Sequence, residues 1–331
     1  MGMKILLYEW SGLMKRDVKT VLRRRGHEVI PFSYESPDWK YDEYMYVNMK
    51  KYIERYNVDV VMSMHFFPTI ADICHEKELP YLSWIYDSPF AVKRGETLQY
   101  KEVYAFIFDR TLVRKLQAEG LSVYYGPLAV DVERLDCMEI TEEEYKRWHG
   151  DASFVGRLWR ETPPNSDDPI RLAQYESALQ RIEYTKALNE ICDFKWFSGQ
   201  VKKLPELEKM EMQDSVFYYS EMPKVFRLSK INLNITLKTI GSGIPLRALD
   251  IMGAGGFLMS DPQEELLENF EPEKDFATFC SKEELCEKTL YYLANEQMRA
   301  GIAQRGHDKV KELFSYEKRL GDMFSQMGLA F

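Results

Sequence analysis

The sequence predicts an α/β protein with two tandem domains, each containing a parallel sheet with helices on both faces. Its 331 residues suit two domains of ordinary size. Short and almost continuously apolar runs, which are typical of strands in a parallel sheet, alternate with helical stretches in both halves. An acidic and mixed segment without a strand, residues 131–150, interrupts this alternation. It is expected to connect a domain of residues 1–130 with a domain of residues 151–314.

The first domain opens with a strand, a helix and a second strand. The run KILLYEW predicts the first strand, a helical stretch follows to about Arg25, and HEVIPFS predicts the second strand. Gly26 suits the left-handed position that follows a helix. Asp109 is expected to cap the amino end of a later helix. The further strands of this domain are expected in VDVVMSMH, YLSWIYD, YAFIFD and VYYGPL.

The second domain resumes the alternation at ASFVGRL. A long amphipathic helix is predicted over about residues 170–192. The tail, from about residue 282 to residue 327, is predicted to be helical with a break near Phe314 and Ser315. The further strands are expected in FKWFSG, INLNIT, GFLMSD and DFATFC.

Composition and charge argue against several classes of function. The net charge of −9 argues against a nucleic-acid binder, because such proteins carry a basic excess. No apolar run approaches the roughly 20 residues of a membrane span, and no secretory signal is visible. The five cysteines are scattered without a CxxC pair, so reduced thiols are expected. The sequence therefore predicts a cytoplasmic protein with no nucleic-acid partner and no integral membrane segment.

Several common motifs are missing from the sequence. It contains no GxxxxGK(S/T) loop and no GxGxxG at the first strand–helix turn. This argues against a P-loop NTPase and an ordinary dinucleotide dehydrogenase. It also contains no HExxH, no dense His/Cys/Asp group and no Asp-x-Asp pair. Neither a bound metal nor a cofactor is therefore expected.

The run SFVGRL has features of an anion site in the second domain. It ends a strand with Gly156 and Arg157, at the edge where ligands of open α/β sheets bind. The glycine lets a ligand approach the backbone, and the guanidinium suits a phosphate. A tight turn followed by a surface arginine is the alternative interpretation.

The stretch GSGIPLRALDIMGAGG, from Gly241 to Gly256, is a second candidate for anion binding. Pro245 suits the first turn of a helix, and the free N–H groups and dipole at a helix start favour an anion. Arg247 adds a full charge, and Asp250 shares its face of the helix. The two side chains could pair with each other, or they could hold a phosphate and vicinal hydroxyls.

The order of INLNIT, GIPLRALDIMGAGGFLMSD and DFATFCSKEELCEKTLYYLANEQMRAGIAQRGHDKVKELFSYEKR resembles the C-terminal half of the CgeB-type, or spore maturation protein-like, glycosyltransferases. These enzymes belong to the two-domain GT-B class. The resemblance covers about residues 152–319, and PLRALDIMGAGGF is its most specific run. It extends more weakly to WIYDSPF, FIFDRTLVRKLQAEG and YYGPLAVD in the first half.

The resemblance implies two facing Rossmann-like domains, with the last helix, residues 315–331, packing back on the first domain. A nucleotide-sugar, expected to carry UDP, would bind the second domain, and an acceptor would bind the first. The implied reaction is transfer of the sugar to a hydroxyl of a protein or glycan acceptor in the interdomain cleft. This reaction would use neither a metal nor a cofactor besides the donor substrate.

The resemblance also implies roles for individual residues. Arg157 and Arg247 would carry the diphosphate, with Lys238 as a third candidate. Related enzymes hold the donor with two acidic residues at the spacing of Ser242 and Asp250, and the second of them binds ribose. Because Ser242 is not acidic, the way the sugar is held, and whether its configuration is retained, stay open. The other residues expected to border the donor are Gly156, Gly243, Tyr219 and Glu221.

Polar residues at strand ends of the first domain are candidates for the base that takes the proton of an acceptor hydroxyl. They are Glu9, His65 and Asp87, because a carboxylate or an imidazole within hydrogen-bond reach can accept that proton. Alternatively, Asp87 caps a turn and the backbone satisfies His65. Nearby aromatic residues could form an acceptor platform or belong to the core: Trp10, Phe66, Phe67, Trp84 and Tyr86.

Two other functions fit the sequence. A nucleotide-sugar epimerase shares this fold class and would convert the donor without an acceptor. A non-catalytic module of a coat or surface assembly would neither transfer nor hydrolyse a donor sugar. The helix that carries Arg247 and Asp250 disfavours this module.

Overall fold

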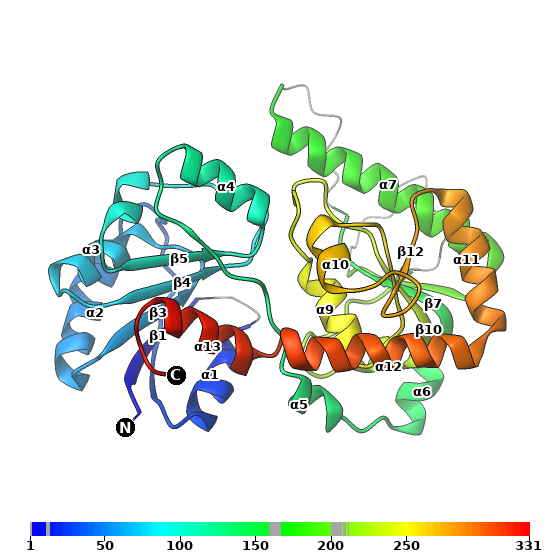
Figure 1. Ribbon diagram of the computed structural model, residues 1–331, viewed down its shortest axis with the longest axis horizontal. Coiled ribbons are helices and arrows are strands. Elements are labelled where there is room, and N and C mark those ends of the chain that lie inside the picture. Colours follow the sequence, from blue (N-terminus) through cyan, green and yellow to red (C-terminus); the bar gives the residue numbers. More distant parts are fainter. Residues whose placement is uncertain (1, 11–13, 159–166, 200–206, 208–209, 211) are drawn as a thin grey trace. The chain divides into compact units, whose positions relative to one another are not determined.

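A computed structural model describes residues 2–331 except residues 11–13, 159–166, 200–206, 208–209 and 211. The chain forms two compact units, one of Met1–Ala129 with Tyr316–Phe331 and one of Val130–Ser315. Each unit contains a sheet of six parallel strands with helices around it (Figure 1). The predicted α/β fold class is therefore confirmed.

The sheet of the first unit has the strand order β2-β1-β3-β4-β5-β6. Its strands are β1 (Lys4–Glu9), β2 (Glu28–Ser33), β3 (Val60–Met64), β4 (Tyr81–Ile85), β5 (Val103–Ile107) and β6 (Tyr124–Tyr125). β3 and β4 are buried over their whole length, which explains why their sequences are continuous rather than alternating. The chain continues from β1 to β2 on one side and to β3 on the other, so the order reverses between β1 and β3.

Capping residues and glycines explain where several helices of the first unit begin and end. They are α1 (Lys15–Arg24), α2 (Glu43–Tyr56), α3 (Pro68–Glu76), α4 (Arg110–Ala118) and α13 (Tyr316–Gln326), with a short 3₁₀ turn at Gly95–Gln99. Gly26 has a φ of 86°, the left-handed conformation predicted after α1. Asp109 accepts hydrogen bonds from two N–H groups in the first turn of α4, which confirms the predicted cap. The sequence predicted no element at α2, which Asp42 caps in the same way.

α13, the last helix of the chain, packs into the first unit. Its buried side chains are Tyr316, Leu320, Met323 and Phe324. Tyr316 meets Trp84 edge to face, with 5.8 Å between the ring centroids. Gly126 permits close packing here, because a Cβ at this position would lie 2.7 Å from both Met323 and Phe106. The chain therefore returns to the first unit after it has completed the second.

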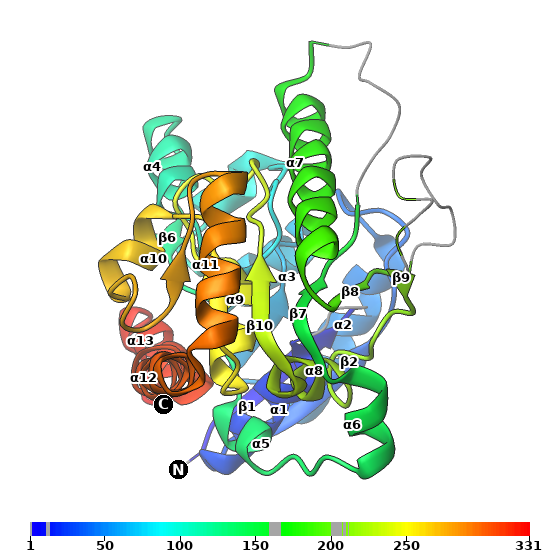
Figure 2. The same ribbon diagram turned by 90° about the vertical axis from the view of Figure 1, so that its right-hand side faces the viewer.

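The sheet of the second unit has the strand order β12-β11-β10-β7-β8-β9, of which Figure 2 labels β10, β7, β8 and β9. Its strands are β7 (Gly150–Val155), β8 (Phe194–Phe197), β9 (Met212–Gln213), β10 (Ser229–Asn234), β11 (Leu258–Ser260) and β12 (Ala277–Thr278). β7 comes first in the chain and lies beside β10, so the order reverses between these two strands. Ser153 of β7 and Asn232 of β10 are buried and hydrogen-bonded to each other at 3.0 Å, which satisfies polar groups inside the core.

The helices of the second unit include the segment that was expected to connect the domains. They are α5 (Val132–Asp136), α6 (Glu142–Trp148), α7 (Pro169–Ile191), α8 (Met222–Leu228), α9 (Leu246–Gly253), α10 (Glu264–Asn269), α11 (Lys282–Ala294) and α12 (Glu296–Leu313). Residues 131–150 form α5, α6 and the start of β7. α12 ends one residue before Phe314, which confirms the predicted break in the tail. Within the described residues, no helix combines the length and the apolar character that a membrane span requires.

Replacing Phe324 by Ala should lower the free energy of unfolding by about 3–5 kcal/mol, the usual cost of removing a buried phenyl group. Phe324 is fully buried and packs against the rings of His27 and Phe331. Urea unfolding measures this change. The control is Ser325→Ala at the next, exposed position of α13, which should stay within about 0.5 kcal/mol of the unmodified protein. Equal stability of the two variants would contradict the packing described for α13.

Candidate functional site

The carboxyl ends of β7 and β10 form the centre of the candidate donor site. Because the strand order reverses between these strands, no connection passes over the space between their ends, where ligands of open α/β sheets bind. Gly156 and Arg157 follow β7, Ile235 and Thr236 follow β10, and Asp261 follows the neighbouring strand β11. Polar groups from three strands therefore meet at this edge.

Gly156 is fixed by its surroundings. Its N–H donates to the carbonyl of Phe197 at 3.1 Å, and its own carbonyl accepts from the indole of Trp196 at 2.9 Å. A Cβ at Gly156 would lie 2.6 Å from the ring of Phe154, so packing within the unit requires glycine here. The Arg157 side chain is exposed and has no hydrogen bond or ion pair with any residue in the described part of the chain. It is available to an anion.

The helix α9 begins one residue later than predicted. Pro245 was expected in its first turn, but it precedes the helix as the N-cap with φ −60° and ψ 141°. Ser242 and Gly243 are buried just before it. The hydroxyl of Ser242 donates to the carboxylate of Glu265 at 2.8 Å, and its carbonyl accepts from the N–H of the same residue at 3.0 Å. Ser242 therefore joins α9 to α10, a contact that the sequence did not reveal.

Arg247 and Asp250 contact each other on α9. The distance from Nη1 of Arg247 to Oδ2 of Asp250 is 3.4 Å. The guanidinium also contacts Sδ of Met222 and lies 5.6 Å from the ring centroid of Phe226. Asp250 accepts a second hydrogen bond from the hydroxyl of Tyr218 at 3.0 Å. The side chain of Arg247 is 28% exposed and that of Asp250 only 8%, so the guanidinium is the more accessible group of the pair.

The remaining predicted donor residues have other partners. Tyr219 lies under the guanidinium of Arg134 at 5.2 Å from the ring centroid, and Lys238 pairs with Glu176 at 3.1 Å. Glu221, the N-cap of α8, accepts from the N–H of Phe217 at 2.8 Å. Tyr219 also packs edge to face against Tyr218, the residue that donates to Asp250.

Arg181, on α7, belongs to the site although the sequence analysis did not identify it. Its Nη1 donates to the carbonyl of Arg157 at 2.8 Å, and its Nη2 donates to the carbonyl of Ile235 at 2.8 Å. The guanidinium lies 5.4 Å from the ring centroid of Phe154. Burial lowers the pKa of Arg181 to about 10, the nearby charge of Asp261 opposes this change, and Arg247 adds to it. Its only sequence signal was a cation in the middle of an amphipathic helix.

Asp261 is the acidic residue whose charge acts on Arg181. One of its carboxylate oxygens accepts from the N–H of Thr236 at 3.0 Å and from the hydroxyl of the same residue at 2.8 Å. Burial raises the pKa of Asp261, while the bonds from Thr236 and the charge of Arg181 act in the opposite direction. The site therefore contains a guanidinium that is held by backbone carbonyls and a carboxyl group that is held by the N–H and the hydroxyl of Thr236.

In the first unit, His65 and Asp87 form a pair at the carboxyl ends of β3 and β4. The distance from Nε2 of His65 to Oδ2 of Asp87 is 3.1 Å. His65 has a φ of 71°, and its N–H donates to the carbonyl of Trp84 at 2.9 Å. Its ring contacts those of Tyr86 and Trp10, at centroid distances of 4.5 and 5.5 Å. Burial lowers the pKa of His65 below its ordinary value, and the charge of Asp87 partly opposes this change.

A cavity of about 300 Å³ opens beside this pair. It is lined by Trp39, His65, Phe66, Asp87, Pro89, Phe90, Ala91 and Lys93. Of the expected aromatic platform, only Phe66 lines the cavity, whereas Phe67 and Trp84 are buried in the core. The sequence did not indicate Trp39 or Phe90, because neither lies next to a strand end.

Glu9 has other partners than His65 and Asp87. It accepts from Nζ of Lys19 at 2.7 Å and from the hydroxyl of Ser33 at 2.8 Å. Burial raises the pKa of Glu9, but these two hydrogen bonds outweigh burial and the net shift is downward. A carboxylate with a lowered pKa and two strong donors is a poor proton acceptor.

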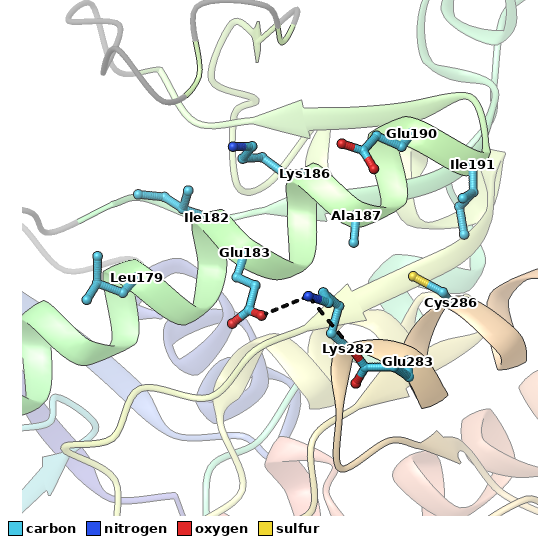
Figure 3. Close-up of a pocket in the computed structure, with 10 residues that line it drawn as sticks. All are labelled: Leu179, Ile182, Glu183, Lys186, Ala187, Glu190, Ile191, Lys282, Glu283 and Cys286. Atoms are coloured by element: carbon cyan, nitrogen blue, oxygen red, sulfur yellow. Dashed lines mark ion pairs between the residues drawn. The ribbon is translucent and has the colours of Figure 1, made fainter.

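A separate cavity of about 590 Å³ lies between α7 and α11 of the second unit (Figure 3). Lys282 forms ion pairs there with Glu183 at 3.3 Å and with Glu283 at 3.8 Å. None of the predicted site residues lines it. Among the residues that the structure describes, no group of three or more His, Cys, Asp or Glu side chains is placed to hold a metal ion.

Comparison with known proteins places this geometry in context. Residues 176–325 match a family model described as glycosyl transferase-like. No curated protein sequence matches the chain. A glycosyltransferase from Rickettsia africae has a TM-score of 0.69 at 12% identity, over 98% of this chain and 97% of that protein. Sucrose-phosphate synthase from Thermosynechococcus elongatus has a TM-score of 0.64 at 11% identity, over 98% of this chain and 99% of that protein.

The Anabaena protein HepE, solved in complex with UDP and glucose, is also similar in structure. Its TM-score is 0.61 at 12% identity, over 98% of this chain and 100% of that protein. These similarities over almost the whole chain show that it has the fold of the GT-B glycosyltransferases. The glycosyl transferase-like match covers α9 with Arg247 and Asp250, and it also covers Arg181.

The imidazole pKa of His65 should lie below its usual value of about 6.5, and Asp87→Asn should lower it further. The reason is that burial disfavours the charged ring, while the negative charge of Asp87 favours it. A titration of the ring resonances by NMR measures both values. His75, which pairs with Glu102 instead, provides the internal control, and its ring resonances should be the same in both proteins. A higher pKa for His65 in the Asn variant would contradict this description of the pair.

Proposed function

We propose that this protein is a glycosyltransferase of the CgeB-type branch, which moves a sugar from a nucleotide diphosphate donor to a hydroxyl acceptor. The glycosyl transferase-like match supports the reaction class, and the run PLRALDIMGAGGF within it supports the branch. The donor binds the unit of residues 130–315, and the acceptor binds the other unit. UDP is the proposed nucleotide, because HepE, which shares the fold, is solved with UDP.

The accessible guanidinium of Arg247 beside the buried carboxylate of Asp250 carries this proposal. Their distance of 3.4 Å is long for a charge-assisted hydrogen bond, so a diphosphate competes well for the guanidinium. Asp250 keeps its hydrogen bond from Tyr218 and can accept others from the ribose hydroxyls. The exposed Arg157 at the end of β7 supplies a second positive charge.

The proposed transfer does not depend on a metal ion. When the bond between the anomeric carbon and the diphosphate oxygen breaks, negative charge grows on the leaving group. This charge is offset by Arg157, Arg247 and the amino end of α9. In other enzymes a bound metal ion stabilises the same charge. The protein thus stabilises the leaving group with groups that are already in place.

His65 is the proposed base for the acceptor. In the neutral ring, the hydrogen on Nε2 is donated to Asp87, which leaves Nδ1 as the proton acceptor. The acceptor oxygen forms its bond to the anomeric carbon while its proton passes to Nδ1, and UDP leaves with the electron pair of the broken bond. Asp87 orients the ring and stabilises the imidazolium that forms.

The proposed acceptor is a compact hydroxyl compound, such as the terminal sugar of a glycan. Only 4% of His65 is exposed, and the cavity of about 300 Å³ beside it is of the size that admits a small molecule. Its apolar wall of Trp39, Pro89 and Phe90 suits the C–H face of a sugar ring. A hydroxyl on the flat surface of a folded protein would not reach the imidazole.

Arg247→Ala should weaken the binding of UDP by about tenfold to a hundredfold, since a hydrogen bond to a charged group contributes about 1.5–3 kcal/mol. Isothermal titration calorimetry measures this affinity. The control is Arg171→Ala, which removes an exposed arginine from α7 and should leave the affinity unchanged. If UDP, GDP and dTDP all fail to bind the unmodified protein, the donor site is wrongly assigned.

His65→Gln should slow sugar transfer by about 10²–10⁴-fold, the usual contribution of a general base, without changing the affinity for UDP. The rate of the unmodified protein should rise with pH through the lowered pKa of His65, because only the neutral ring accepts a proton. In Asp87→Asn this rise should occur at lower pH. Release of UDP from UDP-glucose, with methyl glycosides as acceptors, provides the assay.

An unchanged rate in His65→Gln would argue against the proposed base. The same assay also tests another class of enzyme. If the protein converts a UDP-sugar into its epimer when no acceptor is present, as NMR of the donor would reveal, the activity is that of an epimerase. Transfer to the glycoside without epimer formation supports the proposal.

A further inference from the structure

Arg181 joins the two strand ends that enclose the proposed donor site. It comes from the middle of α7, and its guanidinium donates to the carbonyl of Arg157 after β7 and to the carbonyl of Ile235 after β10. A second bond to Ile235, from Nε at 3.3 Å, completes a forked contact. One cationic side chain therefore bridges the ends of the two central strands.

The positive charge of Arg181 is not matched by a carboxylate in contact with it. Its hydrogen bonds go to neutral carbonyl groups, and no ion pair joins it to any residue in the described part of the chain. Asp261 is near enough to act on its charge, but the carboxylate is bonded to Thr236 instead. A partly buried charge of this kind is costly unless an opposite charge is supplied.

The guanidinium of Arg247 also contributes positive charge near Arg181. Arg247 on α9 is close enough to Arg181 on α7 to disfavour the charge of Arg181. Two like charges held together at the open edge of a sheet create a positive potential there. An anion that binds between the strand ends and α9 would relieve their repulsion and would supply the counter-charge that Arg181 lacks.

We propose that Arg181 is a positioning residue for the donor diphosphate, a role that rests on the proposed function. It fixes the backbone that carries Arg157, and it adds a permanent positive charge next to the phosphates that Arg247 binds. The matching residue of opposite sign is Asp261, which weakens the field that Arg181 creates. Diphosphate affinity therefore depends on the balance of these two charges as well as on direct contacts.

A purely structural arginine would behave differently from a charge that serves the ligand. If Arg181 only joined two strand ends, its loss would disturb the binding of the nucleoside and the diphosphate alike. If its charge acts on the phosphates, its loss affects UDP and spares uridine. Removal of the charge of Asp261 should then have the opposite effect, because that carboxylate repels the phosphates.

The experiment compares the affinities of UDP and uridine for the full chain by calorimetry or by ligand-observed NMR. Arg181→Met should weaken UDP binding by about tenfold or more, with less than a twofold change for uridine. Arg181→Lys, which keeps the charge but loses the fork, should retain part of the affinity. Asp261→Asn should strengthen UDP binding. Arg171→Met, which removes an exposed arginine of the same helix, should change neither ligand.

The outcomes separate this inference from the proposed function. If the unmodified protein does not bind UDP, the proposed function fails. If it binds UDP but Arg181→Met binds as tightly, or loses UDP and uridine equally, the role of Arg181 is overturned. Thermal unfolding checks that each variant is folded. If Arg181→Met does not fold, Arg181→Lys and Asp261→Asn decide the question, because weaker UDP binding in the Asn variant would overturn the charge argument.

Discussion

Both sheets are governed by one topological constraint: the chain leaves a central strand toward opposite sides, so two neighbouring strand ends remain uncovered. Backbone groups at such ends leave the ladder of the sheet and must find other partners. In the first unit the uncovered ends are those of β1 and β3, and the N–H of His65, which follows β3, donates to the carbonyl of Trp84 in β4. In the second, the carbonyls of Arg157 and Ile235 find Arg181. The side chains that complete the fold at these points are therefore the ones that face a ligand.

Burial lowers the pKa of both His65 and Arg181, but it leaves the two side chains in different protonation states. At His65 it favours the neutral ring, which is the form that accepts a proton, and Asp87 limits the change. Arg181 remains protonated despite its lowered pKa of about 10. Its positive charge is therefore partly buried, and a bound anion would stabilise it. The first arrangement suits proton transfer from an acceptor, and the second suits the retention of a diphosphate.

Most elements of the fold were predicted from local sequence patterns. Such patterns are sufficient because helix caps, turns and apolar runs depend on residues that are close together in the chain. The apolar runs became β3 and β4, which are buried on both faces, and Gly26 and Asp109 took their expected conformations at helix ends. The helix α2 was missed, although its buried side chains, Met45, Met49 and Ile53, recur every four residues, as on one face of a helix. Pro245 was misplaced by one residue, because a proline suits the N-cap and the first turn almost equally well.

The sequence by itself determined the order of strands and helices, the glycine and aspartate stops, and the presence of Arg247 and Asp250 on one helix face. Only the tertiary structure decided which polar groups meet. Glu9 forms its hydrogen bonds with Lys19 and Ser33 rather than with His65. Arg181 reaches strand ends that lie 24 and 54 residues away in the chain. These pairings depend on the order and register of the strands. A local sequence pattern does not contain this information, because order and register are fixed by the packing of a whole sheet.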